Sequence, residues 1–245
     1  MRRFGLIGCP LGHSASADYF TEKFGREGIS DCSYALYELP GIDALPELLA
    51  RVPSLEGFNV TIPYKRAVFG YLDEVCGEAQ SVGAVNCVRR SVEGRLTGFN
   101  TDLAGVRASL DELLEGETVE NALVLGTGGA SLAVQFVLSE RGIPYELVSR
   151  DKAKGNYTYD DLPCEAVGYS KLIINASPVG MHPLSDEAPR IPYGYVAPGH
   201  FLFDLVYNPP STRFLDFGRQ RGARVLNGRT MFRVQAEASW KIWNS

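Results

Sequence analysis

The sequence lacks the features that mark membrane and secreted proteins. No apolar run approaches the roughly 18 residues that a membrane-spanning helix needs. The first residues, Met-Arg-Arg-Phe-Gly-Leu-Ile-Gly, contain neither a long apolar core nor a small-residue cleavage site, so we expect a first strand and not a signal peptide. These absences predict a globular, cytoplasmic protein that has no membrane partner.

Cysteine and histidine are scarce. The three histidines, His13, His182 and His200, are too few and too spread to form a metal centre, and we expect His13 to pack or cap locally beside Ser14. The cysteines are odd in number and show no C-x-x-C spacing, which argues against a disulfide framework or a zinc site and for a reducing compartment. They are Cys9, Cys32, Cys76, Cys87 and Cys164.

An excess of positive charge is also missing. The chain carries 24 Lys and Arg against 29 Asp and Glu, a formal net charge of -5, and both parts of the chain share it about equally. Binding to a phosphate backbone needs a basic surface, so nucleic acid is not an expected partner. An anionic small molecule would have to be captured by local donors.

What is present is an alternation of short apolar segments with amphipathic ones, which is typical of parallel α/β folds. The 245 residues suit one large domain or two small ones, and a turn-rich segment at 100–102 is the best candidate boundary. The last helix could dock on either half. We expect strands at 4–8, 33–39, 58–62, 84–89, 122–126, 146–149, 172–175, 201–206 and 223–226, and helices at 14–28, 103–114, 130–141 and 230–243.

The clearest motif joins an apolar strand to glycines that open a helix: Gly126, Thr127, Gly128, Gly129 and Ala130. Such glycines permit a tight turn and let backbone N–H groups approach a pyrophosphate, while the helix N-terminus favours negative charge. A plain strand-turn-helix corner is also rich in glycine. The flanking strand and helix favour a dinucleotide-binding loop.

A ribose-recognising residue is expected about 20 residues further on, where the sequence reads Ser149-Arg150-Asp151. Arg150 suits a 2′-phosphate, because a guanidinium binds phosphate with two parallel hydrogen bonds, and this favours NADP. Asp151 suits a 2′-hydroxyl and leaves NAD possible. A solvated Arg-Asp turn is the third alternative.

Four polar clusters precede the glycine motif. Ser14 and Ser16 alternate, so that in extended backbone both hydroxyls can clamp a carboxylate, although either serine can instead cap the following helix. Period two places Asn59 and Thr61 on one strand face, opposite Val60 and Ile62.

Three further polar residues complete the four clusters: Lys65 belongs with Asn59 and Thr61, and Asn86 and Asp102 are the other two. Lys65 follows just past the end of the strand that carries Asn59 and Thr61, where parallel sheets bind ligands, although a single lysine is usually a surface residue. Asn86 lies in an apolar segment and should be buried and hydrogen-bonded, and Asp102 suits a helix N-cap.

Together these motifs resemble the shikimate dehydrogenases, the reductases of 3-dehydroshikimate. Nearly the whole chain follows the family order: S-x-S at Ser14 and Ser16, N-V-T-x-P-x-K at 59–65, G-A-V-N at 83–86, G-x-N-T-D at 98–102, G-x-G-G-A at 126–130, N-A-S-P-V-G-M at 175–181, D-L-V-Y-N-P at 204–209 and M-F-R-V-Q-A at 231–236.

The resemblance implies a two-domain protein. An α/β substrate domain would comprise residues 1–101 with 227–245, and a Rossmann-like NADP-binding domain residues 102–226. Lys65 would be the catalytic acid/base, paired with Asp102. Ser14 and Ser16 would bind the substrate carboxylate. The ring substituents would meet Asn59, Thr61, Asn86, Asp102, Tyr207 and Gln235, and the cofactor would meet Gly126, Gly128, Gly129, Ala130, Ser149, Arg150, Asp151 and Met181.

The chain departs from the family pattern at three positions. Ala17 follows Ser16 where the family has proline, Asp151 replaces a threonine, and Thr230 replaces a glycine before the last helix. Relatives that act on quinate or aminoshikimate, with relaxed use of NAD and NADP, therefore remain alternatives, as does a non-catalytic NADP-binding sensor. A monomer and a homodimer both stay open.

A ring ketone is reduced by hydride from the nicotinamide and a proton on the developing alkoxide. A lysine side chain is protonated at neutral pH, so Lys65 can supply that proton, and we expect oxidation of the alcohol to improve at alkaline pH.

Overall fold

The computed structural model describes residues 1–12 and 14–245. His13 and the local role expected for it lie outside the described residues. The chain forms two compact units: residues 1–101 together with 236–245 form the first, and residues 102–235 form the second.

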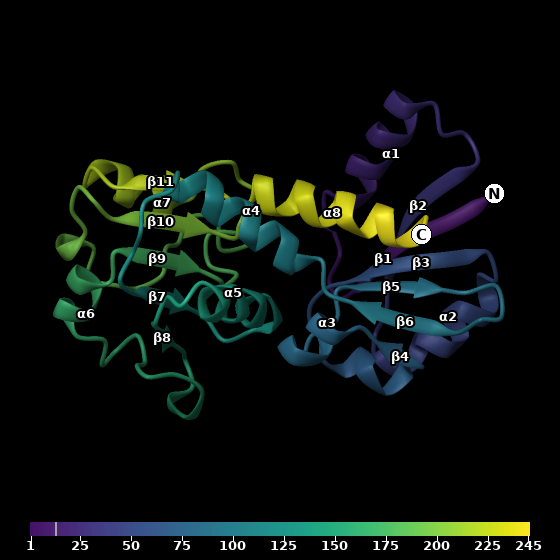
Figure 1. Cartoon of the computed structure of the whole chain (residues 1–245), viewed down its shortest axis with the longest axis horizontal. Helices are drawn as coiled ribbons and strands as arrows, with labels where there is room; N and C mark the ends of the chain where they lie inside the picture. Colours follow the sequence, from purple (N-terminus) through teal and green to yellow (C-terminus); the bar gives the residue numbers. More distant parts are fainter. Residues whose placement is uncertain (13) are drawn as a thin grey trace. The chain divides into compact units, whose positions relative to one another are not determined.

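The first unit contains a six-stranded sheet in the order β2-β1-β3-β5-β6-β4 (Figure 1). Its strands are β1 (Arg2–Gly8), β2 (Cys32–Glu38), β3 (Leu55–Val60), β4 (Glu74–Val75), β5 (Cys87–Arg90) and β6 (Leu96–Phe99). β1 pairs in parallel with β2 and β3, whereas β5 runs antiparallel to both of its neighbours. The sequence pattern favoured a parallel sheet. The few residues between β5 and β6 cannot make a parallel crossover, so the two strands form a hairpin.

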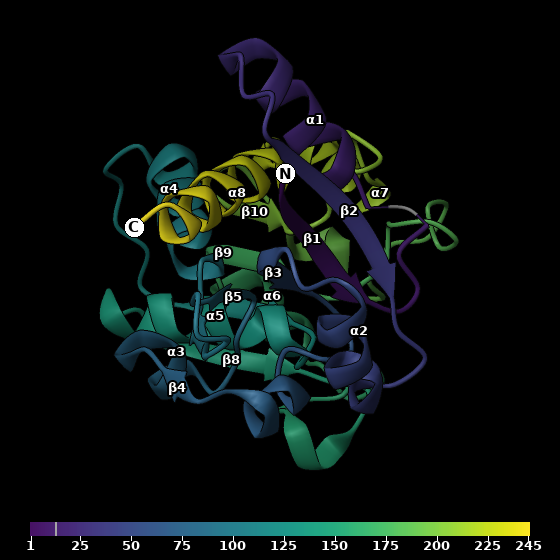
Figure 2. The ribbon, with the colours of Figure 1, turned by 90° about the vertical axis from the view of Figure 1, so that its right-hand side faces the viewer.

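The helices of the first unit are α1 (Ser16–Glu27), α2 (Leu45–Arg51) and α3 (Gly77–Val82), with short 3₁₀ turns at η1 (Ile42–Ala44) and η2 (Ala67–Tyr71). α1 packs against β2, beside which it is seen in Figure 2, and buries Phe20 and Phe24. Both residues recur on one helix face, as the sequence spacing predicted.

The end of the last helix, α8 (Arg229–Trp243), completes the core of the first unit. Trp243 stacks on Phe4, with 4.9 Å between the ring centroids, and its indole N–H donates to the carbonyl of Val88 at 3.0 Å. A side chain at Gly57 would overlap the Trp243 ring, so the two segments are in direct contact. The end of α8 therefore contributes to the same hydrophobic core as the first strand.

A buried ion pair joins α1 to this part of α8. The side chain of Lys23 is only 4% exposed, and its ammonium lies 2.8 Å from the Glu237 carboxylate and 2.9 Å from Glu27. Burial lowers the pKa of Lys23, but the hydrogen bonds to Glu237 and Glu27 more than offset it, so the net direction is upward. The Glu237 carboxylate also accepts from the hydroxyl of Tyr19.

Replacing Glu237 by alanine should therefore destabilise the first unit by about 1–2 kcal/mol. The variant leaves a buried ammonium with one partner, and the cost is smaller than for a fully buried pair because Glu237 is 35% exposed. Urea unfolding measures the change, with Glu22→Ala on the exposed side of α1 as the control. Equal midpoints for the two variants would contradict the assignment.

The second unit contains five parallel strands in the order β11-β10-β9-β7-β8 (Figure 1). The strands are β7 (Ala122–Leu125), β8 (Tyr145–Val148), β9 (Leu172–Asn175), β10 (Phe201–Asp204) and β11 (Arg224–Leu226). The other elements are α4 (Asp102–Leu114), α5 (Gly129–Glu140), α6 (Cys164–Tyr169), α7 (Arg213–Gln220), η3 (Lys152–Lys154) and η4 (Tyr193–Tyr195). The direction of winding reverses between β7 and β9, and such a switch point is where open α/β sheets bind ligands, at the carboxyl ends of the strands.

The second unit extends further along the chain than the sequence predicted. Residues 227–235 were expected in the first domain, but they cluster with the second unit. The reason is the start of α8: Met231 lies directly against Gly105 of α4, and the hydroxyl of Thr230 donates to Glu112 at 2.6 Å. The helix was expected to dock on either half, and its residues are instead divided between the two.

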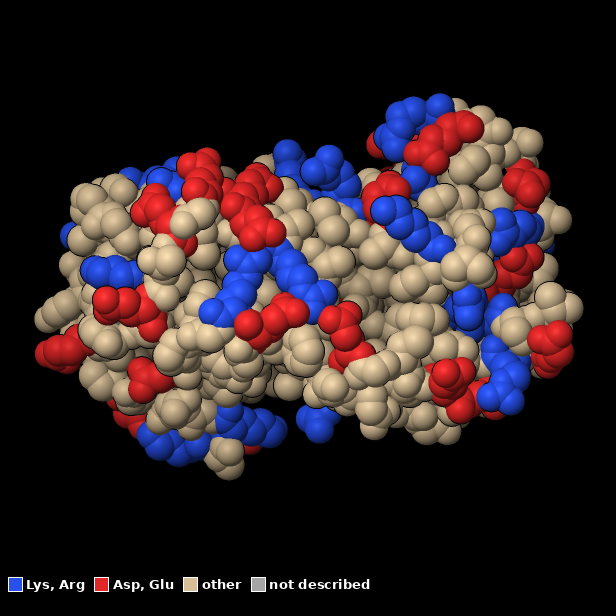
Figure 3. All heavy atoms as spheres, viewed as in Figure 1, with Lys and Arg blue, Asp and Glu red and all other residues tan. Residues whose placement is uncertain are grey.

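Among the described residues, no helix combines the length and the apolar character needed to cross a bilayer. On the face drawn in Figure 3, basic and acidic side chains are interspersed. This distribution fits the weak net negative charge of the sequence.

Candidate active site

The glycine motif lies at the switch point of the second unit. Gly126 directly follows β7 with a φ of +107°, a conformation that disfavours other residues. A Cβ at Gly126 would lie 3.1 Å from the backbone of Ala176 and Ser177, which follow β9. Glycine is thus required here by its backbone conformation and by the close approach of the neighbouring loop.

The N-terminus of α5 is open. Gly128 is the N-cap of the helix, no side chain caps it, and a Cβ at Gly128 would meet nothing within 4 Å. The first amides of a 12-residue helix, at Gly129 and Ala130, are therefore available to an anion, as the motif predicted.

Ser149 connects the glycine loop to the turn that follows β8. Its hydroxyl lies 3.1 Å from that of Thr127 and accepts from the amide of Asp151 at 3.2 Å. Ser149 is 4% exposed and Thr127 is half-buried, so this bridge is partly buried. Thr127 was not among the predicted site residues, although its position between two glycines of the motif was the signal that could have identified it.

Arg150 and Asp151 lie on the exposed turn after Ser149. The Asp151 carboxylate accepts from the amide of Ala153 at 3.1 Å and lies 3.1 Å from the ammonium of Lys154. The hydrogen bond to Lys154, followed by that from Ala153, lowers the pKa of Asp151. The turn therefore presents a cation beside a stable carboxylate, which is the mixed pattern that left NADP and NAD open in the sequence.

The loop after β9 carries Met181. Ser177 folds back onto Asn175, whose side-chain oxygen accepts from the Ser177 hydroxyl at 2.6 Å and from its amide at 3.1 Å. The Asn175 amide donates to the carbonyl of Val179 at 3.0 Å. Met181 is half-buried and continues this turn, its amide donating to the carbonyl of Pro178.

In the first unit, Ser14 and Ser16 lie together, as their spacing predicted. Their hydroxyl oxygens are 3.2 Å apart, and the amide of Ser16 donates to the oxygen of Ser14 at 3.3 Å. Neither serine is the N-cap of α1, because Ala15 occupies that position and no side chain caps the helix. The pair forms one small hydroxyl surface at the start of the helix.

Asn59 is held inside the first unit. Its amide donates to the carbonyl of Asn86 at 3.1 Å and to the hydroxyl of Ser239 at 2.8 Å, and its oxygen accepts from Tyr34. Both amide hydrogens are used within the domain and the residue is 5% exposed. Its contact with substrate stays a prediction, while its structural contribution, joining β3 to α8, is direct.

Asn86 is buried and hydrogen-bonded, as its apolar neighbourhood predicted. Its side-chain oxygen accepts from the amide of Thr101 at 2.6 Å and from the Thr101 hydroxyl at 3.2 Å. Asp102 follows Thr101 in the chain and is 4% exposed. The sequence predicted Asp102 as the N-cap of the helix, but α4 already begins at Asp102, so the N-cap position falls one residue earlier. The chain just before Asp102 is thus fixed by Asn86.

Lys65 follows a turn and not the strand itself. β3 ends at Val60, the amide of Tyr64 donates to the carbonyl of Thr61, and Ile62 is 48% exposed. The expected packing of Ile62 beside Val60 is therefore wrong, because the alternation of faces stops where the strand stops. The carbonyl of Lys65 accepts from the amide of Val85 at 2.8 Å, which fixes the backbone at this position.

Tyr207 and Gln235 share one neighbour in the second unit. The ring of Tyr207 stacks on Phe232, with 4.5 Å between the centroids, and the Gln235 amide donates to the carbonyl of Phe232 at 3.0 Å. Both predicted residues are half-buried. The ring contact therefore joins the loop that carries Tyr207 to the helix that carries Gln235.

Comparison with known proteins identifies the family. Residues 6–88 match the family model of the shikimate dehydrogenase substrate binding domain. The shikimate dehydrogenase (NADP(+)) of Caldanaerobacter subterraneus is 34% identical, over 98% of this chain and 90% of its own length. The chain belongs to the shikimate dehydrogenase family.

Solved structures agree with this membership. The shikimate 5-dehydrogenase of Thermus thermophilus in complex with NADP(H) and shikimate has a TM-score of 0.85 and 34% identity, covering 99% of this chain and 93% of its own. The quinate dehydrogenase of Corynebacterium glutamicum in complex with NAD has a TM-score of 0.86 and 25% identity, with the same coverage. The predicted family, α/β fold and oxidoreductase class are confirmed. The individual site residues stay predictions.

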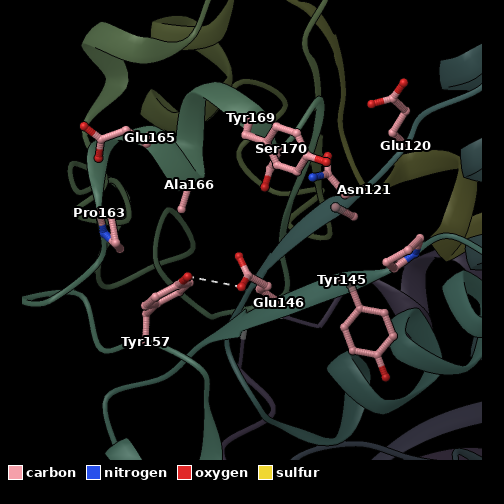
Figure 4. A pocket seen from close by; sticks show the side chains of 12 residues that line it. Glu120, Asn121, Tyr145, Glu146, Tyr157, Pro163, Glu165, Ala166, Tyr169 and Ser170 are labelled. Carbon is pink, nitrogen blue, oxygen red and sulfur yellow. Dashed lines mark hydrogen bonds between the residues drawn. The ribbon is translucent and has the colours of Figure 1, made fainter.

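A cavity of about 550 Å³ lies at the opposite end of the second sheet from the glycine loop (Figure 4). It is formed at the amino ends of β7 and β8 by Ala122 and Tyr145, and the hydroxyl of Tyr157 donates to Glu146 at 3.1 Å in its wall. None of its lining residues belongs to the set predicted for this shikimate dehydrogenase family member. Its position at the amino ends of the strands separates it from the ligand-binding edge.

Proposed function

We propose that this chain catalyses the reversible, NADP-dependent reduction of 3-dehydroshikimate to shikimate. The observation that carries the proposal is the similarity, at 34% identity and over both units, to an enzyme whose structure holds NADP(H) and shikimate together. The product is a precursor in the biosynthesis of chorismate and the aromatic amino acids.

The first unit would bind the substrate and the second the cofactor. In the first unit, the adjacent hydroxyls of Ser14 and Ser16 suit a carboxylate, which accepts hydrogen bonds from both. In the second, the open N-terminus of α5 and the guanidinium of Arg150 suit the pyrophosphate and the 2′-phosphate. The ring substituents would meet Thr61, Asn59, Asn86, Asp102, Tyr207 and Gln235.

NADPH, when bound, supplies the hydride that reduces the ring ketone. The chain must then place a proton on the developing alkoxide oxygen, and we assign this step to the Lys65 ammonium. The backbone bond from Val85 fixes the position from which the side chain extends. Asp102 would pair with Lys65 and orient it, from a backbone position that Asn86 fixes through Thr101.

The assay that tests this proposal follows the absorbance of NADPH with 3-dehydroshikimate as substrate. Parallel assays with 3-dehydroquinate, with the 3-dehydro ketone of aminoshikimate and with NADH separate the shikimate enzyme from relatives with other substrates or relaxed cofactor use. Turnover with 3-dehydroshikimate and NADPH should exceed that with each other pair. Cofactor binding without turnover of any pair would instead identify a sensor.

Asp151 should weaken the preference for NADP. Its carboxylate is negatively charged at neutral pH and pairs with the ammonium of Lys154. A 2′-phosphate bound at Arg150 would therefore lie near a second negative charge, and the paired Lys154 would attract it less. We expect Asp151→Thr to lower the KM for NADP⁺ about 3- to 10-fold and to leave the KM for NAD⁺ unchanged.

The control for this variant is Asp160→Asn, which removes an exposed charge elsewhere in the same unit. Steady-state kinetics with both cofactors gives the four constants. An unchanged ratio of the two KM values in Asp151→Thr would show that the carboxylate does not face the phosphate.

The cysteines support a cytoplasmic location, which we also propose. All five are free in the structure, and Cys87 is fully buried with its pKa raised to about 12 by desolvation. Thiols in this state are typical of proteins in a reducing compartment.

A further inference from the structure

A buried carboxylate lies at the ligand-binding edge of the second unit, and no step proposed above uses it. Asp204 is the last residue of β10 and has no exposed surface. β10 is the neighbour of β9 in the sheet (Figure 1), so the loops that follow the two strands leave the same edge. These loops carry Met181 and Tyr207, which we expect at the cofactor and the substrate.

Three donors from three different segments converge on Asp204. The side-chain amide of Asn175, at the end of β9, donates to one carboxylate oxygen at 2.9 Å. The amide of Val206, directly before Tyr207, donates to the same oxygen at 3.0 Å. The hydroxyl of Thr212, the N-cap of α7, donates to the other oxygen at 2.5 Å.

The segments that carry these donors also contact one another and the neighbouring loops. Asn175 orders the turn at Ser177 and Val179, as described above. A Cβ at Gly180 would lie 3.2 Å from the Thr212 side chain, so the loop after β9 also rests on the start of α7. Gly228, after β11, would overlap the carbonyl of Leu205 if it carried a side chain. Loops from three strands therefore meet around one carboxylate.

We propose that Asp204 is a positioning residue, which holds the loops carrying Met181 and Tyr207 in the arrangement that hydride transfer requires. This inference rests on the proposed function for the roles of those two residues. A misplacement of about 1 Å in a reacting group can cost about 100-fold in rate, so loss of the shared anchor should be seen in kcat.

Protonation gives this anchor a pH dependence. Burial raises the pKa of Asp204 to about 7, and the hydrogen bonds from Thr212, Val206 and Asn175 act in the opposite direction. The titratable side chain that faces it from η4 is Tyr193, whose own pKa is raised by burial and then by the negative charge of Asp204. As pH rises through about 7, the carboxyl loses its proton and becomes an acceptor for all three donors.

The decisive variant is Asp204→Asn, which keeps the shape and replaces one acceptor oxygen by a donor. We expect kcat for reduction of 3-dehydroshikimate to fall about 10- to 100-fold. The wild-type profile should rise as pH passes through about 7, and this step should be absent in the variant. Asp216→Asn, on the exposed side of α7, is the matched control and should keep both the rate and the step.

Thr212 provides a second pair of variants in case Asp204→Asn does not fold. Thr212→Ser keeps the hydroxyl and should stay within about 2-fold of wild type, whereas Thr212→Val should lose about 3- to 10-fold in kcat. A wild-type rate and pH profile in folded Asp204→Asn, or equal rates in the Thr212 pair, would overturn the inference.

The anchoring role of Asp204 can be tested even if the proposed function is wrong. If the wild-type chain itself does not reduce 3-dehydroshikimate, the proposed function fails, and calorimetric titration with NADP⁺ then tests the anchor. Weaker binding by Asp204→Asn than by Asp216→Asn would support the anchor. Equal binding by the two variants would contradict it.

Discussion

Replacement of Lys65 by alanine is expected to lower kcat for reduction of 3-dehydroshikimate by about 100- to 10,000-fold, the usual contribution of a positioned general acid. Substrate affinity should change much less, because the carboxylate is assigned to Ser14 and Ser16. The backbone bond between Lys65 and Val85 does not involve the side chain, so the surrounding turn should persist in the variant.

Stopped-flow measurement of a single turnover, together with substrate titration, separates the two effects. Arg66→Ala is the matched control, because it removes the adjacent exposed cation from the same turn. The assignment of Lys65 fails if its alanine variant binds substrate and turns over within a few-fold of the Arg66 variant.

Replacement of Arg150 by alanine is expected to raise the KM for NADP⁺ about 10- to 100-fold and to leave the KM for NAD⁺ within about 2-fold. A hydrogen bond to a charged group contributes about 1.5–3 kcal/mol, which corresponds to about 10- to 100-fold. The guanidinium can make two such bonds to a 2′-phosphate, but Arg150 is exposed and screening by water keeps their combined effect within this range. Only NADP⁺ carries that phosphate, so the ratio of the two constants isolates the contact.

The measurement is steady-state oxidation of shikimate with each cofactor. Arg190→Ala, an exposed cation of the same unit, controls for a general loss of positive charge. Parallel losses with NADP⁺ and NAD⁺ would place the effect of Arg150 in folding or in the pyrophosphate contact, and not at the 2′-phosphate.

Most strands and the long helices could be predicted because their patterns are local, whereas the short strands β4 and β6 were not predicted. The apolar run at 172–175 is strand β9 without change, and the glycines after β7 open α5 as expected. Six-residue helices such as α3 are shorter than two turns and show no clear period, so they escaped prediction. The antiparallel direction of β5 depends on its pairing partners, which no local pattern encodes.

The site residues could be predicted where they lie within one motif. They were harder to predict where their contacts join residues that are far apart in the sequence. Ser14 and Ser16 meet because they are two residues apart. The contact between Asn59 and Ser239 joins residues 180 positions apart, and the bridge from Thr127 to Ser149 joins two separate loops. The acidic residue at 204 was part of a recognised motif, but its three hydrogen-bond donors became visible only in the structure.

The division of α8 also bears on the order in which the protein can fold during synthesis. The ribosome makes Phe4 more than 200 residues before Trp243, yet the core around Phe4 needs Trp243. The second unit consists of one continuous segment, 102–235, and its whole sequence is available earlier. The half of the protein that is made first is therefore the half that can complete its core last, although domains usually fold in the order of their synthesis.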